Sequence, residues 1–597
     1  MNCPLMRSAM GIFLFTLVCI SISSAAIENY KSPQQSYQDR SKLADLNLSG
    51  LNLSAAHLNR SDMRQSILTN ADLSGAWLQG SQISNAFLIK ANLSEADMEE
   101  VCLQESDLSY ANLRRANLVL SDLFGANLTG ADLTGADLQQ SMIIEAKLSG
   151  AKLDNSNLMA SNLNNSDLTD ASLVGSYMRR AILRNASLVR ANITGASLVG
   201  ANLIYADLSR ADLRGADLSE SRLYGSKLID SNISKSNAIF ANLTGTNLSG
   251  SDLSNSILRG SCFSNADMSN ADLSDADLSD AELHEANLTE AKLIRANASG
   301  ACMNGADLSK ADLSNADIDD AKMHGVKLVG AKLIEADATG ACLEYSDLRG
   351  ANLTGMRLVE TNLVGANMKG LNMHRAIAMS AKMSWTDLSD SCLSESQLSR
   401  VEFYGTDLSK SNLSKADLAR AYMMRSNLTG SDLMDADLTC SDLSNAVLKG
   451  ANLNSANLYG TSLNGADLTG VDLVSANLQG LNLIGANFNR TKLDGSTLQG
   501  PMLIQDVNFS NASLRNARLE LILLKNVSLA GADLSGANLT MIMMMGVDLS
   551  KANLEDIKYD KFSLQNLLSS KLNGTRMTDE LKKDMESLRT MQMKYPE

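Results

Sequence analysis

The sequence predicts an all-β fold, a four-sided parallel β-helix closed by a C-terminal helix, and three observations support this. An apolar residue recurs every five positions, as in ANLTGADLTGADLQQ (residues 126–140), whereas an amphipathic helix repeats about every 3.6 residues and a half-buried strand about every two. The period continues for 93 consecutive pentapeptides from Leu43 to Leu503. The segment TDELKKDMESLRTMQMK (578–594) has helical spacing instead.

Each pentapeptide is expected to form one side of a coil. In Ala131–Asp132–Leu133, strand alternation sends Ala131 and Leu133 to one face and Asp132 to the other. Thr134 and Gly135 then turn the chain. If each turn is about a right angle, four pentapeptides close a coil with sides of about 10 Å, at about 3.3 Å per extended residue. The predicted core therefore contains Leu128, Leu133 and Leu138.

The sizes of the central residues support a coil of four pentapeptides. Four of the centres are alanine, and all four fall on one face because their numbers differ by multiples of 20. Protein interiors are closely packed, so a small side chain needs a large neighbour. Several large centres lie on the adjacent face. The alanines are Ala238, Ala298, Ala338 and Ala378, and the large core residues include Phe263, Met303 and Phe403.

The repeat resembles that of the pentapeptide-repeat family over about residues 41–560. The family pattern A(D/N)LXX is written out at ANLTG, ADLTG, ADLSG and ANLSE. The resemblance implies a right-handed quadrilateral parallel β-helix, and the handedness rests on the resemblance alone.

The repeat divides the chain into segments. An uninterrupted β-helix is expected over residues 41–505. The centre after Leu503 is Phe509, six positions on and close to Pro501, which predicts a bulge or short loop. A continuation over residues 506–560 ends at Tyr559 and brings the total to 104 repeats, or about 26 coils.

Residues 561–597 are expected to form a helical cap, because exposed strand edges promote aggregation. Thr578 can cap the helix predicted over 578–594, with acidic residues in its first turn. Leu581, Met585 and Leu588 follow helical spacing and are expected to close the last coil. Some members of the family dimerise through a terminal helix, so a homodimer through this helix is the alternative role.

The N-terminal segment 1–26 has the pattern of a signal peptide. Arg7 supplies a positive charge, residues 9–20 (AMGIFLFTLVCI) form a short apolar run, and residues 21–26 (SISSAA) offer small side chains. Cleavage after Ala26 would leave a polar segment, residues 27–40, before the repeats. The alternative is an uncleaved anchor. The interpretation favours a periplasmic or secreted protein that contacts the membrane only through its signal peptide.

Composition and motifs argue against an enzyme. The formal net charge is −15, which disfavours direct nucleic-acid binding. Only four histidines are present, which leaves little general-base or metal chemistry. No phosphate-binding loop, nucleophile elbow or zinc-protease motif occurs in the sequence. We therefore expect no catalytic residues and no cofactor.

A set of regularly spaced cysteines and histidines is the weak candidate for a metal site. Cys262, Cys302 and Cys342 recur at intervals of 40, as do His284 and His324. Thiols and imidazoles on one face could hold a soft metal. Residues 261–300 and 301–340 match at 21 of 40 positions, however, so a duplication explains the spacing. We expect no metal, and no disulfide, because two coils separate the cysteines by about 9.6 Å and a disulfide spans about 4.4–6.8 Å.

The leading functional hypothesis is an exported, non-enzymatic scaffold or binding surface for an unidentified protein or envelope partner. The family resemblance offers one alternative: some members imitate DNA and occupy the DNA-binding surface of DNA gyrase. The signal peptide and the length of the repeat oppose this alternative. Interleaved cations oppose it too, because the outward positions alternate in sign along one face. These positions are Asp272, Lys292, Asp312 and Lys332.

Overall fold

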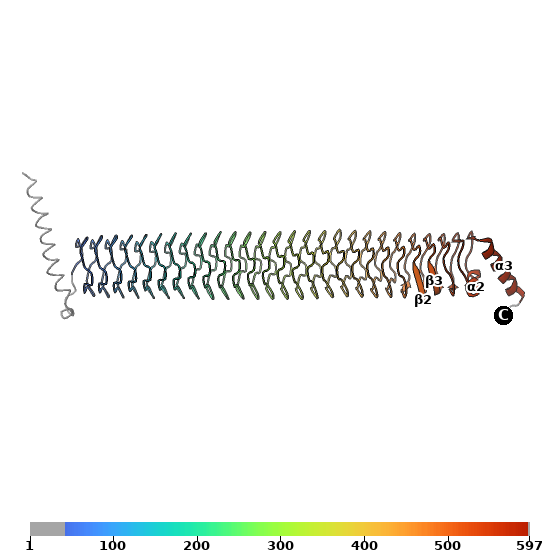
Figure 1. Cartoon of the computed structure of the whole chain (residues 1–597), viewed down its shortest axis with the longest axis horizontal. Helices are drawn as coiled ribbons and strands as arrows, with labels where there is room; N and C mark the ends of the chain where they lie inside the picture. Colours follow the sequence, from blue (N-terminus) through green and yellow to red (C-terminus); the bar gives the residue numbers. More distant parts are fainter. Residues whose placement is uncertain (1–41, 595–597) are drawn as a thin grey trace, which may run out of the picture. The chain divides into compact units, whose positions relative to one another are not determined.

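The computed structural model describes residues 42–594. The described chain divides at Glu282/Leu283 into two compact units, which we call unit 1 and unit 2. Within each unit the chain winds through stacked coils, one behind the next (Figure 1). The predicted signal peptide, its cleavage point at Ala26 and the polar segment 27–40 lie outside the described residues.

Unit 1 is a parallel β-solenoid with four pentapeptides in each coil. Asp132 forms a parallel bridge with Lys152 of the next coil. The Leu133 amide donates to the Lys152 carbonyl (2.7 Å), and the Asp132 amide donates to the Ala111 carbonyl in the preceding coil (2.9 Å). Each side of a coil is thus bonded to both neighbouring coils. The prediction of a four-sided parallel β-helix is confirmed.

The inward positions of unit 1 carry the side chains that the period predicts. Leu128 and Leu138 are 1% exposed and Leu133 is fully buried, as is Phe263. The residue that precedes each central residue by two positions also faces inward; it is usually alanine, as at Ala131, and often serine, as at Ser121. The core is therefore a column of mainly leucine centres flanked by small side chains.

The corners of the coil are β-turns with a left-handed residue. The Ala136 amide donates to the Leu133 carbonyl (2.9 Å), and Gly135 between them has φ of 70°. Every fifth residue repeats this geometry, and many are not glycine, such as Arg115 with φ of 56°. A left-handed conformation costs a non-glycine residue about 1–2 kcal/mol. The side chain of Asn112 offsets part of this cost in the Arg115 turn, because its Oδ1 accepts the Arg114 amide (3.2 Å).

Aromatic residues at these corners are followed, one coil later, by glycine. Among the described residues five aromatics have a positive φ, and in each case a Cβ built on the equivalent residue of the next coil would lie within 3.0 Å of the aromatic side chain. The ring therefore occupies the space above the next turn. The pairs are Tyr110 with Gly130, Tyr205 with Gly225, Phe240 with Gly260, Tyr345 with Gly365, and Trp385 with Gly405.

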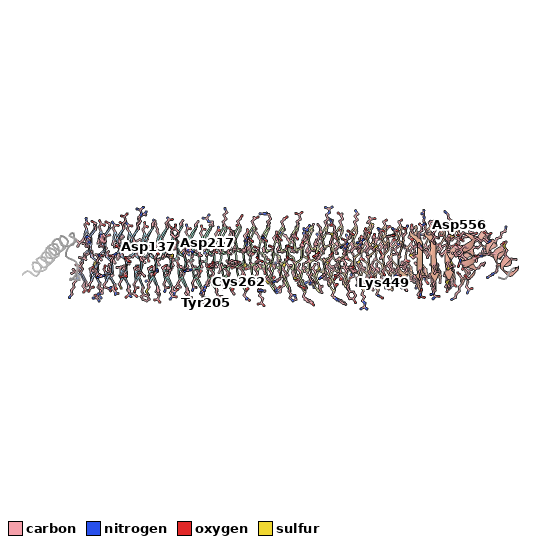
Figure 2. The ribbon with its side chains drawn as sticks, turned by 90° about the horizontal axis from the view of Figure 1, so that it is seen from below. Asp137, Tyr205, Asp217, Cys262, Lys449 and Asp556 are labelled. Carbon is pink, nitrogen blue, oxygen red and sulfur yellow. The ribbon has the colours of Figure 1, made fainter. Side chains whose placement is uncertain are left out.

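Replacing Gly225 with Ala should destabilise unit 1 more than replacing Gly215 with Ala. The two glycines have nearly equal φ, 64° and 65°, so the backbone penalty is shared. A Cβ on Gly225 would lie 2.5 Å from Cε1 of Tyr205, whereas a Cβ on Gly215 meets nothing within 4 Å. Displacing the ring of Tyr205 (labelled in Figure 2) from its rotamer should add about 0.5–1.5 kcal/mol. Equal unfolding midpoints in urea for the two variants would show that the ring does not control this turn.

Unit 2 begins with regular coils of the same design. The Leu283 amide donates to the Cys302 carbonyl (2.7 Å), and the bridges again join equivalent residues of successive coils. Met303 is 1% exposed and Phe403 is fully buried. The alanine centres Ala298, Ala338 and Ala378 are fully buried as well.

Near residue 500 two adjacent sides of the coil straighten into longer strands. β1 (Leu483–Ile484), β2 (Thr497–Gln505), β3 (Arg518–Lys525) and β4 (Met543–Met545) form a four-stranded parallel sheet in that order. β2 and β3 lie side by side in Figure 1. Their pairing shifts between Gln499 and Met502, where β2 holds one extra residue.

The prediction that Leu503 is a central residue was wrong. Leu503 is 41% exposed, whereas Ile504 is fully buried and Met502 is 6% exposed. The extra residue sits at Gly500–Pro501, so the register changes before Leu503 and not after it. Leu498 is the last centre of the first register, and Ile504 is the first of the second. A run of apolar residues allowed both assignments in the sequence, and the pairing with β3 selects one.

The C-terminal cap has two helices. α2 (Lys561–Leu568) follows the last straightened coil, β6 (Arg576–Met577) pairs with β5 (Asn553–Leu554), and α3 (Asp579–Lys594) follows. α3 occupies the segment predicted to be helical. Its residues Leu581, Met585 and Leu588 are buried, and α3 contacts α2. The position of α2 was not predicted. α2, and not α3, covers β4.

Side chains of α2 and its N-cap close the open edge of β4. Asp560, the N-cap of α2, accepts the Met541 amide (2.9 Å). Ser563 Oγ accepts the Ile542 amide (3.3 Å), and Asn566 Oδ1 accepts the Met544 amide (3.1 Å). A strand edge left open in this position would recruit other strands. α2 therefore replaces the next coil as the hydrogen-bonding partner.

Candidate interaction surfaces

The middle outward position of most sides carries a polar side chain, and many of these side chains are hydrogen-bonded within the chain. Asp132 Oδ1 accepts both the Thr134 amide (3.0 Å) and the Thr134 hydroxyl (2.5 Å). Neighbouring coils connect at the same position: Asn112 Nδ2 donates to Asn92, and Asn92 Nδ2 donates to Asp72, each over 2.9 Å. These polar ladders fix the outward side chains in place and repeat them coil by coil.

Charged residues on the outer faces of unit 2 neutralise one another across coils. Lys292, Asp312 and Lys332 follow one another in register. Lys332 Nζ lies 3.4 Å from Oδ2 of Asp312. Partial burial raises the pKa of the Asp312 carboxyl, but hydrogen bonds from Ser314 and the charge of Lys332 outweigh it, so the pKa is lowered overall. These three residues alternate in charge, so this stretch of the face is not a uniform anionic surface.

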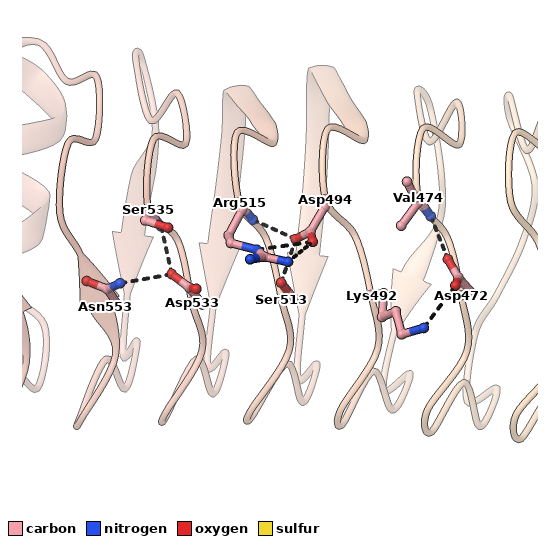
Figure 3. A network of polar contacts seen from close by, with 9 residues as sticks. All are labelled: Asp472, Val474, Lys492, Asp494, Ser513, Arg515, Asp533, Ser535 and Asn553. Atoms are coloured by element: carbon pink, nitrogen blue, oxygen red, sulfur yellow. Dashed lines mark hydrogen bonds and ion pairs between the residues drawn. The ribbon is translucent and has the colours of Figure 1, made fainter.

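Asp494 forms the most densely bonded of the polar contacts in Figure 3. Its Oδ1 accepts the Ser513 hydroxyl (2.5 Å) and the Arg515 amide (3.0 Å). Its Oδ2 accepts Nη2 of Arg515 over 2.7 Å. Partial burial raises the pKa of Asp494, but the bonds donated by Arg515 and Ser513 outweigh this effect and lower it. The carboxylate thus fastens one coil to the next at a corner.

Replacing Asp494 with Asn should reduce the stability of unit 2 in a pH-dependent way. The folded pKa lies below the ordinary value of 3.8, so the carboxylate stabilises the fold above about pH 4 and loses this effect as the pH falls through the folded pKa. The difference in free energy of unfolding between wild type and variant should be largest near neutral pH and should shrink below about pH 4. Urea unfolding at several pH values measures this. Arg515→Gln is the matched control. In that background the stability difference between the chains with Asp and with Asn at position 494 should be smaller, because Arg515 no longer pairs with the carboxylate. A stability difference that does not change with pH would contradict the role assigned to the carboxylate.

The structure does not assemble the predicted cysteine and histidine set into a metal site. In unit 2, Lys322 lies between Cys302 and Cys342 and bridges to both. His324 instead packs edge-on against Tyr345, with ring centroids 5.5 Å apart. Within residues 42–594, no three His, Cys, Asp or Glu side chains are grouped as metal ligands.

The Cys342 thiol is not activated as a thiolate. Burial and the nearby carboxylate of Glu344 raise the pKa of the Cys342 thiol, so it stays protonated at neutral pH. In unit 1, Cys262 is half-buried with its Sγ 3.1 Å from the Thr244 hydroxyl. Cys262, Cys302 and Cys342 are free thiols, as are Cys102, Cys392 and Cys440.

The straightened sheet of unit 2 carries an apolar surface that sequence reasoning missed. Outward positions that in most other coils hold polar residues are apolar in three successive coils. We call this surface the apolar face, and its residues are Leu503, Leu521, Leu523, Met541, Met543 and Phe562. The signal was present in PMLIQ, LELILLK and MIMMM, where apolar residues occupy outward as well as inward positions. It becomes visible only when the coils are aligned.

A profile of a known family covers most of the solenoid. The profile described as Pentapeptide repeats (8 copies) matches residues 47–158, 161–237, 239–355, 357–395, 402–500 and 504–540. These segments make up more than half of the chain. The chain belongs to the pentapeptide-repeat family. The family fold is a right-handed parallel β-solenoid, in agreement with the handedness expected from the resemblance.

Solved structures of other pentapeptide-repeat proteins resemble parts of this one. HetL, involved in heterocyst differentiation regulation in the cyanobacterium Nostoc sp. strain PCC 7120, is 33% identical over 34% of this chain and 88% of its own, with a TM-score of 0.22. QnrB1, a plasmid-mediated fluoroquinolone resistance protein, is 13% identical over 37% of this chain and 96% of its own, with a TM-score of 0.18. A pentapeptide repeat protein from the Arabidopsis thaliana thylakoid lumen is 26% identical over 19% of this chain and 68% of its own, with a TM-score of 0.13.

No curated protein sequence matches the chain significantly. Neither α2 nor α3, the helices among the described residues, is long and apolar enough to cross a bilayer.

Proposed function

We propose that this pentapeptide-repeat protein is an exported, non-enzymatic scaffold that presents binding surfaces to another protein or to a component of the cell envelope. The observation that carries the proposal is the register of the outer surface. Equivalent outward residues of successive coils lie side by side, as Lys292, Asp312 and Lys332 do. A partner with an extended or periodic surface that lies along such a row would contact an equivalent residue at every coil, about every 4.8 Å.

The rigidity of the coils supports a binding role. Each side of a coil is hydrogen-bonded to the coils before and after it, as Asp132 and Leu133 show. The outward side chains are also held by their own bonds, such as that from Thr134 to Asp132. Binding to a surface that is already ordered costs little conformational entropy. The interior is filled by apolar and small side chains of the chain itself, so we place recognition on the outside.

Export rests on the N-terminal segment 1–26 of the sequence, and it is tested separately from the scaffold role. The protein is purified from its own cells after fractionation, and its N-terminus is sequenced. We expect the mature chain to begin near Ile27 and to leave the cytoplasmic fraction. Intact Met1 on most molecules in the cytoplasm would overturn the export proposal.

Imitation of DNA at DNA gyrase is the second candidate function. The formal net charge of −15 favours it. The cross-coil pairing of Lys332 with Asp312, and of Lys327 with Asp307 over 3.4 Å, works against it, because a polyanion needs a uniform negative surface. Inhibition of gyrase supercoiling by the purified full chain, together with a cytoplasmic location, would place this candidate first.

A further inference from the structure

The apolar face consists of side chains aligned by the pairing of successive coils. Leu503 of β2 pairs with Leu523 of β3, and Leu523 pairs with Met543 of β4. These three form an outward apolar ladder on a sheet whose inward side is already packed. In the preceding coil the register places Asn482 beside Leu503, so the ladder starts abruptly at the straightened strands.

The apolar face holds a shallow, open groove with an aromatic side chain at its margin. A groove of about 500 Å³ runs over β2, β3 and β4 between Pro501 and Phe562 of α2. Phe562 is 39% exposed at the margin of this groove. A surface that carries both a hollow and a knob can fit a second copy of itself, because a two-fold axis places each knob opposite the other's hollow.

The apolar face is large enough to matter in water. Leu521 is 48% exposed, Met541 53% and Met543 41%. If a large apolar side chain offers about 150–250 Å², the six residues together expose on the order of 500 Å² of apolar surface. Two copies would bury about 1,000 Å² of such surface, and polar residues at the margin would bring the total near 1,200 Å², the lower end of specific interfaces.

Nothing in the described part of the chain covers this face. The apolar side of α3 is occupied within its own chain, because Leu581, Met585 and Leu588 are buried. α2 covers the edge of β4, where Asn566 accepts the Met544 amide, and leaves the outward side chains of β4 exposed. A dimer through Leu581, Met585 and Leu588 of the C-terminal helix would therefore have to use side chains that are already packed, whereas those of the apolar face are exposed.

The residues of the face also narrow the choice of partner. None of them is charged, so an anionic or cationic partner gains no ion pair there. Methionine side chains are flexible and adapt to the shape of an apposed surface.

We propose that a second copy of this chain docks on the apolar face, sheet against sheet about a two-fold axis, with Phe562 of each copy in the groove of the other. The small area predicts a dimer that dissociates on dilution.

The oligomeric state of the full chain tests this proposal. Sedimentation velocity over a wide range of concentration, in a reducing buffer that excludes intermolecular disulfides, should show a shift from monomer to twice the monomer mass. Leu523→Lys and Met543→Lys should each abolish the dimer. Val447→Lys is the matched control, because Val447 is an outward apolar residue of unit 2 (39% exposed) in a regular coil, and it should leave the dimer intact.

A second variant distinguishes loss of docking from loss of folding. Phe562→Ala removes the proposed knob without placing a charge on the sheet, and it should raise the dimer dissociation constant at least tenfold while circular dichroism and thermal unfolding of the monomer stay unchanged. A wild-type chain that remains monomeric at every concentration would overturn the proposal. So would a dimer that persists in Leu523→Lys, Met543→Lys and Phe562→Ala, because the interface would then lie elsewhere.

Discussion

Replacing Leu133 with Asp should destabilise unit 1 by about 4 kcal/mol or more. Leu133 is fully buried in a column of leucine and alanine. Loss of its burial costs about 1.5–3 kcal/mol, and a carboxylate without a partner in the same place adds several kcal/mol or takes up a proton. Its neighbours Leu128 and Leu138 are buried as well, so no water can reach the new group without opening the coil.

The matched control is Asp132→Leu, one position away. Asp132 faces outward, and its replacement removes the bonds from Thr134 and the ion pair with Arg114, whose Nη1 lies 3.2 Å from Oδ2. Those interactions are partly exposed, so the loss should be about 1 kcal/mol. Urea unfolding followed by circular dichroism compares the two variants.

The damage from Leu133→Asp should remain local. Coils contact only their neighbours, so the stability of a solenoid is a sum over adjacent repeats. Limited proteolysis should cut the variant near residue 133 and leave distant coils protected. Equal resistance of Leu133→Asp and Asp132→Leu would contradict the inward assignment, and complete digestion of the chain would contradict the nearest-neighbour view of its stability.

Replacing Asp560, Ser563 and Asn566 together with Ala should open the C-terminal end of unit 2. The three side chains accept the amides of Met541, Ile542 and Met544, and the last two residues are buried. Leaving buried amides without acceptors costs about 1–3 kcal/mol each, so the change should cost about 3–5 kcal/mol in all. Asp560 also accepts the Ser563 amide as the N-cap of α2, so the helix itself should fray.

Hydrogen exchange resolves this effect. The amides of β4 should lose protection in the triple variant, while those of the regular coils before residue 480 should keep it. The control is the pair Lys561→Ala and Gln565→Ala, which lie on the exposed side of α2 and raise its helix propensity without touching β4. Unchanged protection of β4 in the triple variant would show that α2 is not the partner of this edge.

One of the candidate surfaces could be predicted from the sequence, and another could not. The alternation of Lys292, Asp312 and Lys332 was predictable, because a coil of four pentapeptides places them in one row. The apolar face was not, because Leu503 and Met543 look like ordinary members of apolar runs until their neighbours in space are known. The aromatic–glycine pairs at the corners were missed for the same reason.

The sequence by itself determined the direction of each side chain in the regular coils. A period of five, with alternation inside each short strand, sends Leu133 inward and Asp132 outward whatever the rest of the chain does, because the choice is made locally. It also determined α3, whose apolar residues follow helical spacing over a long segment. Only the tertiary structure decided where the extra residue at Gly500–Pro501 is accommodated, that α2 closes β4, and that the apolar face exists. Each of these depends on which coil lies beside which, and hydrogen bonds between successive coils set that arrangement.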